Sequence, residues 1–563
     1  MRCISCAFAV CLMVFVTVTL SGAVSFSAAG THGAVATDQR LATEEGIRVL
    51  KTGGNAVDAA VAIGYTLAVT YPAAGNIGGG GFMLVRRADG TSHFIDFRET
   101  APAASSATMY LDRAGHVVPQ RSTVGVLSTG VPGSVAGLEY ARKHFGTRSR
   151  RELMATAVAY AQNGFTLTEA DAAVLSRSAP LLRRFASSRS IFLSSGAAFK
   201  PGDVLRQPNL ANTLRAVERS GTDGFYRGAV ASRLAASTRA AGGILTTADL
   251  AAYRAVERKP ISCAHRDMTI VTSPPPSSGG IAICEALGII GDAPLGRPRS
   301  SRAAHREIEA ERRAFADRNT ELGDPDFVNV PVNRLLNPSY LAAERASIAP
   351  NRATPSSNVH AGDRAEQEGT NTTNYSVVDK DGDAVDVTYT LNNSFGSGFV
   401  ANGTGVLLND EMDDFTSKPG APNMFGLVQG AANAIAPHKR PLSSMSPTIV
   451  SDARGHVVLV AGAAGGPRII TTTLDIARDV IDFGEPVGAA VAAPRMHMQW
   501  LPDVVYAEPG TFSNAATASL RAMGYHIDFG SAGSVANAVA VKRNGTRVAA
   551  HDDRNATGSA LAY

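Results

Sequence analysis

The boundary between residues 371 and 372 constrains the folding of this chain more than any other feature of the sequence. Segment 350–371 (PNRATPSSNVHAGDRAEQEGTN) is polar and almost free of large apolar side chains, which is typical of an exposed connector. The clearest strand pattern in the chain begins directly after it, with Tyr375–Asp379, a Lys-Asp-Gly turn and Ala384–Leu391. The composition of the segment alone favours a plain domain linker.

Composition and charge limit the class of protein. The chain has 563 residues, of which 45% are hydrophobic and 18% are charged. This composition excludes an intrinsically disordered or collagen-like chain, and the length suits two or three folding units or one large one. Lysine and arginine (53) barely exceed aspartate and glutamate (49), so we expect no nucleic-acid partner and no anionic membrane partner.

Residues 1–29 have the features of a secretory signal peptide. Arg2 precedes an apolar run over 4–20, and small residues that suit cleavage follow at 21–23 and 27–29. An uncleaved anchor is the alternative, because the run is at the short end of a membrane span. We expect an exported protein, periplasmic or secreted, with no membrane attachment after cleavage.

Two of the five cysteines, Cys263 and Cys284, lie outside this signal peptide. They could form one disulfide in an oxidising compartment, but the sequence does not show that they meet. The fold therefore does not depend on a framework of several disulfides.

The other segments predict a mixture of helices and strands. A helix, a turn and an Ala-rich second helix are expected over Asp38–Val69. Segment 150–349 is expected to be largely helical, with a break at Pro274–Pro276. Further strands are expected at Phe82–Val85, His93–Phe97, Thr448–Val450 and His456–Val460, and a further helix at Ile469–Phe483.

The short catalytic signatures G-x-S-x-G, H-E-x-x-H, the P-loop and G-x-G-x-x-G are absent from the sequence. The twelve histidines are scattered singly, which argues against a metal site. An N-terminal nucleophile is still available. When a peptide bond breaks before a Ser, Thr or Cys, the freed α-amine becomes the base for the hydroxyl or thiol of the same residue. The connector before Thr372 and the glycine-rich run 462–466, with its exposed N–H groups, suit this design.

Five motifs, in this order along the chain, resemble those of the γ-glutamyltranspeptidases. They are Asp96–Pro102, Asp324–Val328, Thr372–Asp379, Thr388–Asn392 and Pro441–Pro447. The similarity extends from about Ala34 to Tyr563.

This resemblance implies an α+β fold, the four-layer αββα sandwich of the N-terminal-nucleophile hydrolases, built jointly by two chains from one precursor. It implies self-cleavage between Asn371 and Thr372, which gives a large subunit over 30–371, with a flexible end at 350–371, and a small subunit over 372–563. The implied activity transfers the γ-glutamyl group of glutathione or related donors to water, amino acids or dipeptides. No metal or organic cofactor is implied.

The resemblance also assigns roles to individual residues. Thr372 is the implied nucleophile, Thr390 its hydrogen-bond partner, and Gly465 and Gly466 form the oxyanion hole. The resemblance implies that Arg98 binds the α-carboxylate of the γ-glutamyl group, with further hydrogen bonds from Ser443 and Ser444. It implies that Asp414 binds the α-ammonium, with Glu411 and Asn392 completing that cluster. Taken without the resemblance, each residue also suits an ordinary strand, turn or surface ion pair. Arg312-Arg313 and Arg148–Arg151 are expected on solvated faces, and Trp500 in packing.

Three positions depart from the family pattern. The family often has His at the position of Asn374, and we expect little consequence. Many bacterial members have Gln where this chain has Glu411, and a carboxylate still suits an ammonium. Phe425 lies in the expected lid loop, Lys418–Arg440, where some members have a Tyr that bonds the active-site Asn. Phe425 has no hydroxyl, so the lid would close on Asn392 without that bond and the ratio of hydrolysis to transfer stays open.

Two alternatives belong to other functional classes. A glutaryl or cephalosporin acylase on the same scaffold would remove an acyl group that lacks the α-amine, so that Asp414 would have no partner. A catalytically dead secreted binding protein would fail to cleave itself.

Overall fold

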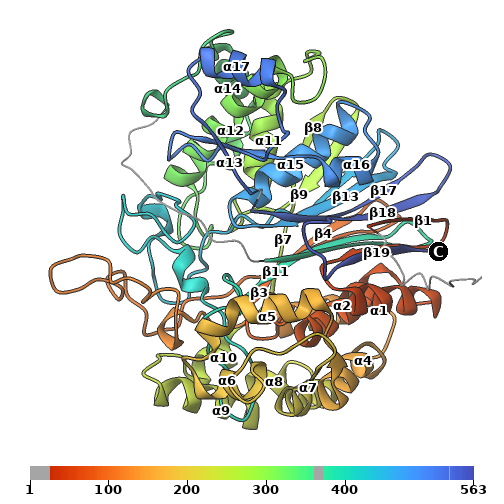
Figure 1. The fold of residues 1–563 in the computed structure, drawn as a ribbon, viewed down its shortest axis with the longest axis vertical. Helices are drawn as coiled ribbons and strands as arrows, with labels where there is room; N and C mark the ends of the chain where they lie inside the picture. The colour runs from red at the N-terminus through yellow and green to blue at the C-terminus, as the bar shows by residue number, and fades with distance from the viewer. Residues whose placement is uncertain (1–25, 360–371, 532) are drawn as a thin grey trace, which may run out of the picture.

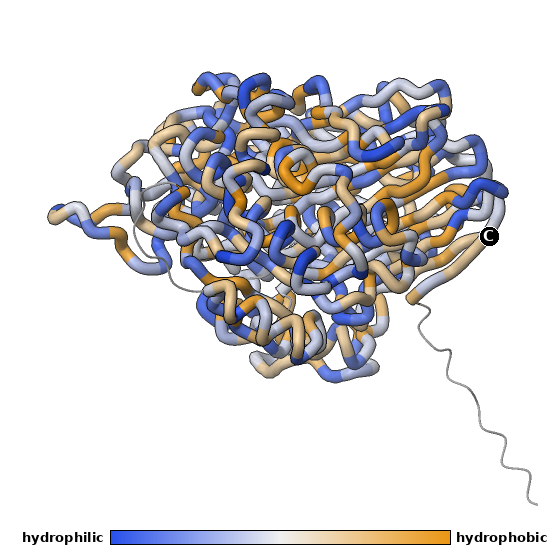
Figure 2. The backbone as a smooth tube through the Cα atoms, turned by 90° about the horizontal axis from the view of Figure 1, so that it is seen from above, coloured by the Kyte–Doolittle hydropathy of each residue, from blue (hydrophilic) through white to orange (hydrophobic). Residues whose placement is uncertain are grey.

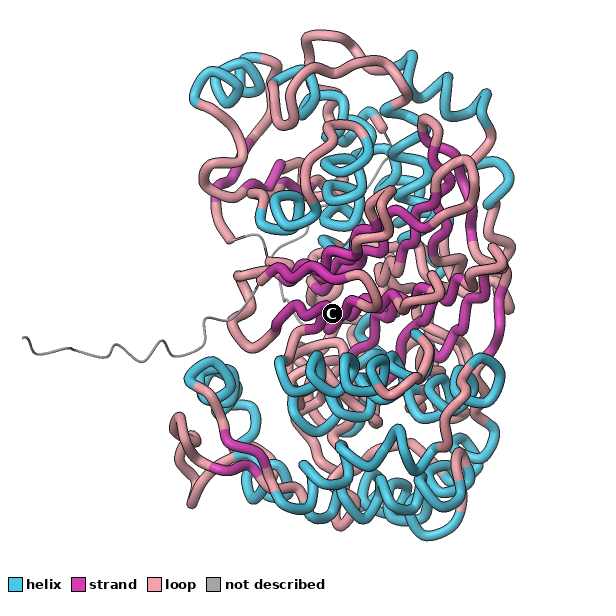
Figure 3. The backbone as a smooth tube through the Cα atoms, turned by 90° about the vertical axis from the view of Figure 1, so that its right-hand side faces the viewer, coloured by secondary structure: helices cyan, strands magenta, loops and turns pink. Residues whose placement is uncertain are grey.

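Two seven-stranded antiparallel sheets face each other in the centre of the molecule, with helices on both outer faces (Figure 1). The structure, a computed structural model, describes residues 26–359, 372–531 and 533–563. In the side view, two layers of strands lie between two layers of helices (Figure 3). The expected αββα architecture is therefore confirmed, while its division between two chains stays a prediction.

The first sheet combines strands from both sides of the boundary at residue 371. Its order is β19 (Ser559–Ala562), β2 (Ala34–Thr37), β10 (Thr373–Val378), β11 (Ala384–Thr390), β3 (Gly80–Arg86), β4 (Ser92–Phe97) and β7 (Val256–Arg258). The second sheet is mixed in the same way. Its order is β1 (Ser27–Gly30), β18 (Arg547–His551), β17 (Val535–Val541), β13 (Val457–Ala464), β12 (Thr448–Ser451), β9 (Met268–Thr272) and β8 (Ile261–His265).

Two small sheets lie outside these layers. One contains β14 (Met496–His497), β15 (Val505–Ala507) and β16 (Ile527–Phe529), and the other contains β5 (Phe165–Thr166) and β6 (Val204–Leu205).

Helices from the first half of the chain cover the first sheet. They are α1 (Arg40–Lys51), α2 (Ala56–Thr70), α3 (Ser134–Phe145), α4 (Arg150–Asn163), α5 (Glu169–Leu182), α6 (Ala186–Phe192), α7 (Pro208–Ser220), α8 (Asp223–Tyr226), α9 (Gly228–Ala240) and α10 (Thr247–Ala252). Later helices cover the second sheet. They are α11 (Gly279–Ile290), α12 (Ser301–Glu321), α13 (Val332–Leu335), α14 (Pro338–Ser347), α15 (Arg468–Ile481), α16 (Val487–Ala492) and α17 (Asn514–Ala522).

Local sequence explains the helices next to the sheets. A capping box begins α2, because the Asn55 side chain accepts from the Asp58 N–H and the Asp58 carboxylate accepts from the Asn55 N–H. Every residue of α2 is buried, and its many alanines allow close approach to α1, α3 and α4. Apolar residues follow the central strands, while many outer loops are hydrophilic (Figure 2).

Polar side chains fill part of the space between the two sheets. The Asn374 amide of β10 donates to Asp386 Oδ1 (3.2 Å) and to the Val387 carbonyl (3.0 Å). The Ser376 hydroxyl donates to Asp386 Oδ1 at 2.7 Å. Burial raises the pKa of Asp386 to about 7, against the hydrogen bonds that favour its charged form. The buried Asn374 side chain thus connects β10 to β11 by hydrogen bonds, two residues after Thr372.

Most expected elements are confirmed, including the α1–α2 pair, the β3–β4 hairpin and the β10–β11 hairpin. Within the segment expected to be largely helical, the β8–β9 hairpin over 261–272 was not expected. Trp500 is 2% exposed and packs in the core, as predicted. The expectation that Arg312 and Arg313 are solvated is wrong: they are 1% and 4% exposed because α12 is covered by the segments after it.

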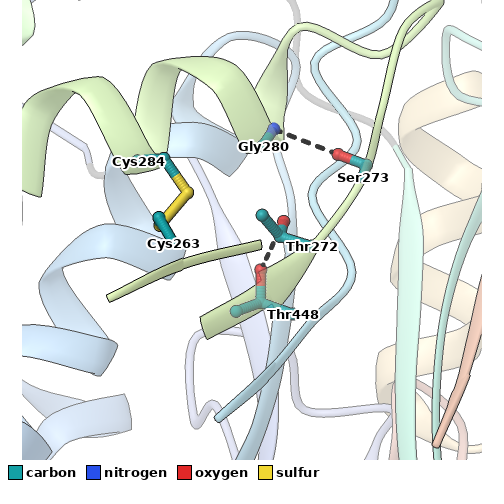
Figure 4. Close-up of a disulfide and its surroundings, with 6 residues drawn as sticks. All are labelled: Cys263, Thr272, Ser273, Gly280, Cys284 and Thr448. Atoms are coloured by element: carbon teal, nitrogen blue, oxygen red, sulfur yellow. Dashed lines mark hydrogen bonds between the residues drawn. A yellow bond between two sulfur atoms is a disulfide. The ribbon is translucent and has the colours of Figure 1, made fainter. Parts of the chain in front are cut away.

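Cys263 of β8 and Cys284 of α11 form a disulfide (Figure 4). It ties the edge strand of the second sheet to the helix above it. The sequence left this pairing open. At its N-terminal end, α11 is also held by the Gly280 N–H, which donates to Ser273 Oγ at 3.1 Å.

Residues 1–25 of the expected signal peptide lie outside the described residues. Ser27–Ala29, which we also assigned to it, belong to β1 and pair with residues 548–550 of β18. Of the expected connector, 360–371 lie outside the described residues, while Ser356 is buried and its hydroxyl donates to the Trp500 carbonyl at 2.6 Å. In the described ranges, no helix is long and apolar enough to cross a membrane.

Candidate active site

Thr372 lies at the start of β10, beside the end of β11. The register pairs Thr373 with Tyr389, which places Thr372 next to Thr390. The Thr372 hydroxyl donates to Thr390 Oγ1 at 3.3 Å, and the Asn392 N–H donates to the same oxygen at 2.8 Å. Thr372 is 8% exposed. A nucleophile at this position would be held by a second hydroxyl whose own orientation is fixed by the backbone.

Gly465 and Gly466 connect β13 to α15 next to Thr372. Their φ angles are +135° and +56°, a conformation that favours glycine. A Cβ on Gly465 would lie 2.5 Å from the Gly533 carbonyl oxygen, and one on Gly466 would lie 2.7 Å from the Phe425 ring. Backbone strain and the lack of space therefore both require glycine here. The carbonyls of Gly465 and Gly466 accept from the Arg468 and Ile469 N–H groups of α15, both at 3.1 Å, so the N–H groups of the two glycines are the donors considered for an oxyanion hole.

Arg98 follows β4 and is fully buried. Its Nε donates to the Pro441 carbonyl (3.2 Å) and its Nη2 to the Leu442 carbonyl (3.3 Å), so the guanidinium plane is fixed by backbone. The guanidinium also forms ion pairs with Glu411 and Asp414. One planar cation between two carboxylates is suited to a ligand that carries both a carboxylate and an ammonium.

The electrostatics of this cluster follow from its burial. Burial raises the pKa of Glu411 and of Asp414, and the charge of Arg98 opposes both shifts. Burial disfavours the charged form of Arg98, but Glu411 and Asp414 outweigh it, so the pKa of Arg98 is raised. Glu99, beneath them, has its pKa raised to about 8 by burial. The cluster therefore keeps a permanent cation beside carboxylates whose charge depends on it.

Ser443 and Ser444 line the same small pocket as Thr372 and Arg98. Arg318, which the sequence analysis missed, lies behind them. Its Nη2 donates to Ser444 Oγ at 2.9 Å and its Nε to Ser278 Oγ at 3.0 Å. Burial lowers the pKa of Arg318 to about 10, which still leaves it charged at neutral pH. The pocket thus contains a second cation on the side where a carboxylate was expected.

The Asp324–Val328 motif positions this loop instead of lining the pocket. Asp324 Oδ2 accepts from the Arg440 N–H at 2.8 Å, directly before Pro441. Arg258 donates from Nη2 to Asp326 at 2.7 Å and from Nε to Asp96 at 2.7 Å. These bonds join β4, which ends directly before Arg98, to the loop that contains Ser443 and Ser444.

The expected lid covers the small pocket. Phe425 is 6% exposed and its ring lies over Gly466. The Asn392 amide donates to the Asp410 carbonyl at 3.1 Å and to Met424 Sδ at 3.6 Å. The contact of Asn392 with the lid is therefore a weak hydrogen bond to the sulfur of Met424, the residue before Phe425.

The structure brings all but one of the predicted site residues into one cluster. Asn371 lies outside the described residues. The small pocket is lined by Arg98, Thr372, Thr390, Asn392, Glu411, Asp414, Ser443, Ser444 and Gly466, together with Arg318 and Phe425. Gly465 lines an adjoining cavity that also includes Thr372. The individual catalytic and binding roles stay predictions.

One acidic cluster among the described residues has the spacing of a metal site: Glu307 and Glu311 of α12 and Asp475 of α15. All three are buried, and burial raises the pKa of Glu311 and of Asp475. Arg478 forms an ion pair with Glu307. A raised pKa on Glu311 and Asp475 favours their protonated forms, and Glu307 is paired with Arg478. The cluster can therefore connect α12 and α15 without a metal ion.

Comparison with known proteins gives one family. The family model described as Gamma-glutamyltranspeptidase matches residues 42–563. A glutathione hydrolase proenzyme of Pseudomonas sp. (strain A14) is 53% identical over 475 residues, which cover 84% of this chain and 82% of the relative. That of Escherichia coli (strain K12) is 45% identical over 535 residues, which cover 94% and 92%.

Solved structures agree in fold. Cephalosporin acylase from Bacillus halodurans matches with a TM-score of 0.84 at 25% identity, over 98% of this chain and 99% of that one. Gamma-glutamyltranspeptidase from Helicobacter pylori matches with a TM-score of 0.56 at 40% identity, over 57% of this chain and 93% of that one.

Proposed function

The chain belongs to the gamma-glutamyltranspeptidase family, and from this premise we propose that it is a self-processing γ-glutamyltransferase and glutathione hydrolase. It transfers the γ-glutamyl group of glutathione and related compounds to water, amino acids or dipeptides. One observation carries the proposal. Thr372, at the start of a strand, lies in one small pocket with Arg98 and Asp414, next to the strained Gly465–Gly466 turn.

The first reaction is cleavage of the chain itself. The Thr372 hydroxyl oxygen attacks the carbonyl carbon of Asn371, the peptide C–N bond breaks, and the nitrogen takes the hydroxyl proton. The two chains are then joined by an ester. Water attacks that ester, the C–O bond breaks, and a carboxylate on Asn371 and a free hydroxyl and amine on Thr372 result.

The topology supports a heterodimer after this cut. Strands from before residue 371 pair directly with strands from after it in both sheets: β1 with β18 and β9 with β12 in the second sheet, and β2 with β19 and β10, and β3 with β11, in the first. Each sheet therefore keeps hydrogen bonds and apolar contacts between the two chains, and separation would expose both sheet interiors.

In catalysis the donor binds with its α-carboxylate at Arg98, Ser443 and Ser444 and its α-ammonium at Asp414, with Glu411 and Asn392 beside it. The Thr372 amine takes the hydroxyl proton while the oxygen attacks the γ-carbonyl carbon. N–H groups of Gly465 and Gly466 stabilise the oxyanion. The C–N bond breaks, and the proton passes to the leaving nitrogen.

The resulting γ-glutamyl-threonine ester has two fates. Water attacks it and gives glutamate, or the amino group of an acceptor attacks it and gives a new γ-glutamyl amide. In each case the C–O bond to Thr372 breaks and the hydroxyl recovers its proton. Phe425 over Gly466 limits the entry of water without a hydroxyl bond to Asn392, so access depends on ring packing.

A cephalosporin or glutaryl acylase is the competing function, because such an acylase shares the fold. Asp414 favours the γ-glutamyl donor, since its carboxylate faces the pocket and a glutaryl group has no ammonium to meet it. The curated glutathione hydrolases are also more similar in sequence than the acylase.

Hydrolysis of γ-glutamyl-p-nitroanilide and glutaryl-p-nitroanilide tests this choice. We expect kcat/KM to favour the γ-glutamyl compound by about a hundredfold, and Asp414→Ala to abolish most of that preference. Preference of the wild-type protein for the glutaryl compound would overturn the proposal.

Export completes the proposal. Because Ser27–Gly30 pair with β18, we propose that signal cleavage precedes Ser27, at the small residues 21–23, and that the mature protein is periplasmic or secreted. N-terminal sequencing of the exported large chain tests this. A first residue after Ala29 would contradict it.

A further inference from the structure

A second cavity adjoins the site. It has a volume of about 580 Å³ and shares Thr372 with the pocket that contains Arg98, while the other lining residues of the two differ. We call it the outer cavity. Residues from α5, from the loop after β11 and from the loops before β17 and after β18 line it.

The position of Thr372 decides what each space can hold. Its oxygen attacks the carbonyl carbon of the scissile bond, so this bond lies where the two spaces meet. The pocket with Arg98 and Asp414 takes the γ-glutamyl side. The part of the donor beyond the amide nitrogen therefore extends into the outer cavity, which is large enough for a dipeptide.

Most charged groups of the outer cavity are already paired. Arg554 donates to Glu508 and to Asp552, the latter at 2.8 Å. Asp38 is 1% exposed, and it accepts from the Thr373 hydroxyl at 2.9 Å and from the Asn537 amide at 2.9 Å. These charged groups are engaged with other side chains of the protein and so have few hydrogen-bonding positions left for a ligand.

Arg177 differs from them. It is exposed, and it has no hydrogen bond or ion pair to any residue in the described part of the chain. It lines the cavity together with Val174, Ser178 and Leu181, at the spacing that places all four on one face of α5. Ser178 Oγ lies 3.4 Å from Ser394 Oγ, which fixes this face beside the loop after β11.

We propose that Arg177 determines specificity in this reaction, and that its guanidinium pairs with the C-terminal carboxylate of the leaving group in the outer cavity. The inference rests on the proposed function and deepens it. Glutathione carries a glycine carboxylate at that end, and an amino-acid or dipeptide acceptor that enters the same cavity carries one too. The outer cavity thereby selects peptides with a free carboxyl terminus.

The test compares glutathione with its C-terminal amide, which differ in that carboxylate alone. Arg177→Met is expected to raise KM for glutathione about tenfold, the worth of one charged hydrogen bond, and to leave kcat within twofold. The amide should show the same KM in both proteins. Arg177→Lys should restore part of the loss, and added salt should raise KM for glutathione in the wild-type protein alone.

Arg151→Met on α4 is the matched control, because its side chain is 89% exposed outside the cavity. Arg151→Met should change KM for neither glutathione nor its amide. Equal effects of Arg177→Met on glutathione and on its amide, or no effect on either, would overturn the inference. Failure of the wild-type protein to hydrolyse either compound would instead overturn the proposed function.

Discussion

The Thr372 hydroxyl donates to Thr390 Oγ1 over 3.3 Å, across the open end of the hairpin formed by β10 and β11. The Asn392 N–H donates to the same oxygen, so Thr390 has a fixed lone pair for the nucleophile. The two strands thus carry both the reacting hydroxyl and the group that orients it.

Replacement of Thr390 should slow both reactions of Thr372. Thr390→Val keeps the shape but removes the acceptor, so we expect self-cleavage and hydrolysis of γ-glutamyl-p-nitroanilide to slow by about 10–100-fold. Thr390→Ser restores the hydroxyl and should recover most of the rate. Equal rates for the Val and Ser variants would show that the hydroxyl is not used.

Arg318 should act in donor binding through Ser444. Arg318→Met removes a buried cation and its bonds to Ser278 and Ser444, and should raise KM for γ-glutamyl donors about tenfold or more. Arg302→Met, an exposed position on the same helix, is the control and should leave KM unchanged. A loss confined to thermal stability, with KM intact, would make Arg318 a structural residue.

Asp386 should make stability depend on pH. Its pKa is raised by burial to about 7 from an ordinary 3.8, so between these values the folded state binds more protons than the unfolded state. Stability from this group is therefore present at low pH and is lost as pH rises through 7. In urea unfolding of the uncut Thr372→Ala protein at pH 5 and pH 8, Asp386→Asn should reduce the loss of stability with rising pH. An unchanged difference between the two pH values would contradict the assignment.

The disulfide between Cys263 and Cys284 should contribute stability but not activity. It closes a loop with a sequence separation of 21, for which chain entropy gives about 3 kcal/mol. Cys263→Ala with Cys284→Ala should lower the melting temperature and leave kcat/KM at 25 °C within twofold, because neither residue lines the pocket. A large loss of kcat at 25 °C would show that α11 positions Ser278 and the Ser443 loop through this bond.

The strongest local patterns predicted the fold well. The β10–β11 hairpin has a tight turn between two apolar runs, and α2 has a capping box before its alanines, so local preference and tertiary packing agree. The β8–β9 hairpin was missed because β8 is an edge strand, with Ser262 and Ala264 exposed and a cysteine between them. Its apolar content is too low to stand out from the surrounding helices.

Some site residues could likewise be predicted from local sequence, and others could not. Thr372 and Arg98 lie in motifs whose members are close in sequence, and Asp414 was assigned through the family resemblance. Arg318 was missed because α12 is rich in charged residues, and its partners Ser278 and Ser444 lie 40 and 126 residues away. Only the tertiary fold shows that this arginine, like Arg312 and Arg313, is buried. The role of Arg177 could not be predicted from the sequence either, because it depends on which cavity α5 lines.

The denatured intact masses of the purified wild-type protein and of Thr372→Ala test the central claim most directly. We expect two chains from the wild type, the smaller being residues 372–563 at roughly 20 kDa of the 58.4 kDa precursor. Thr372→Ala should give one uncut chain, because the attacking oxygen is gone. Cleavage of the Thr372→Ala protein at the same bond, or a small chain that begins at another residue, would contradict the assignment of Thr372 as nucleophile.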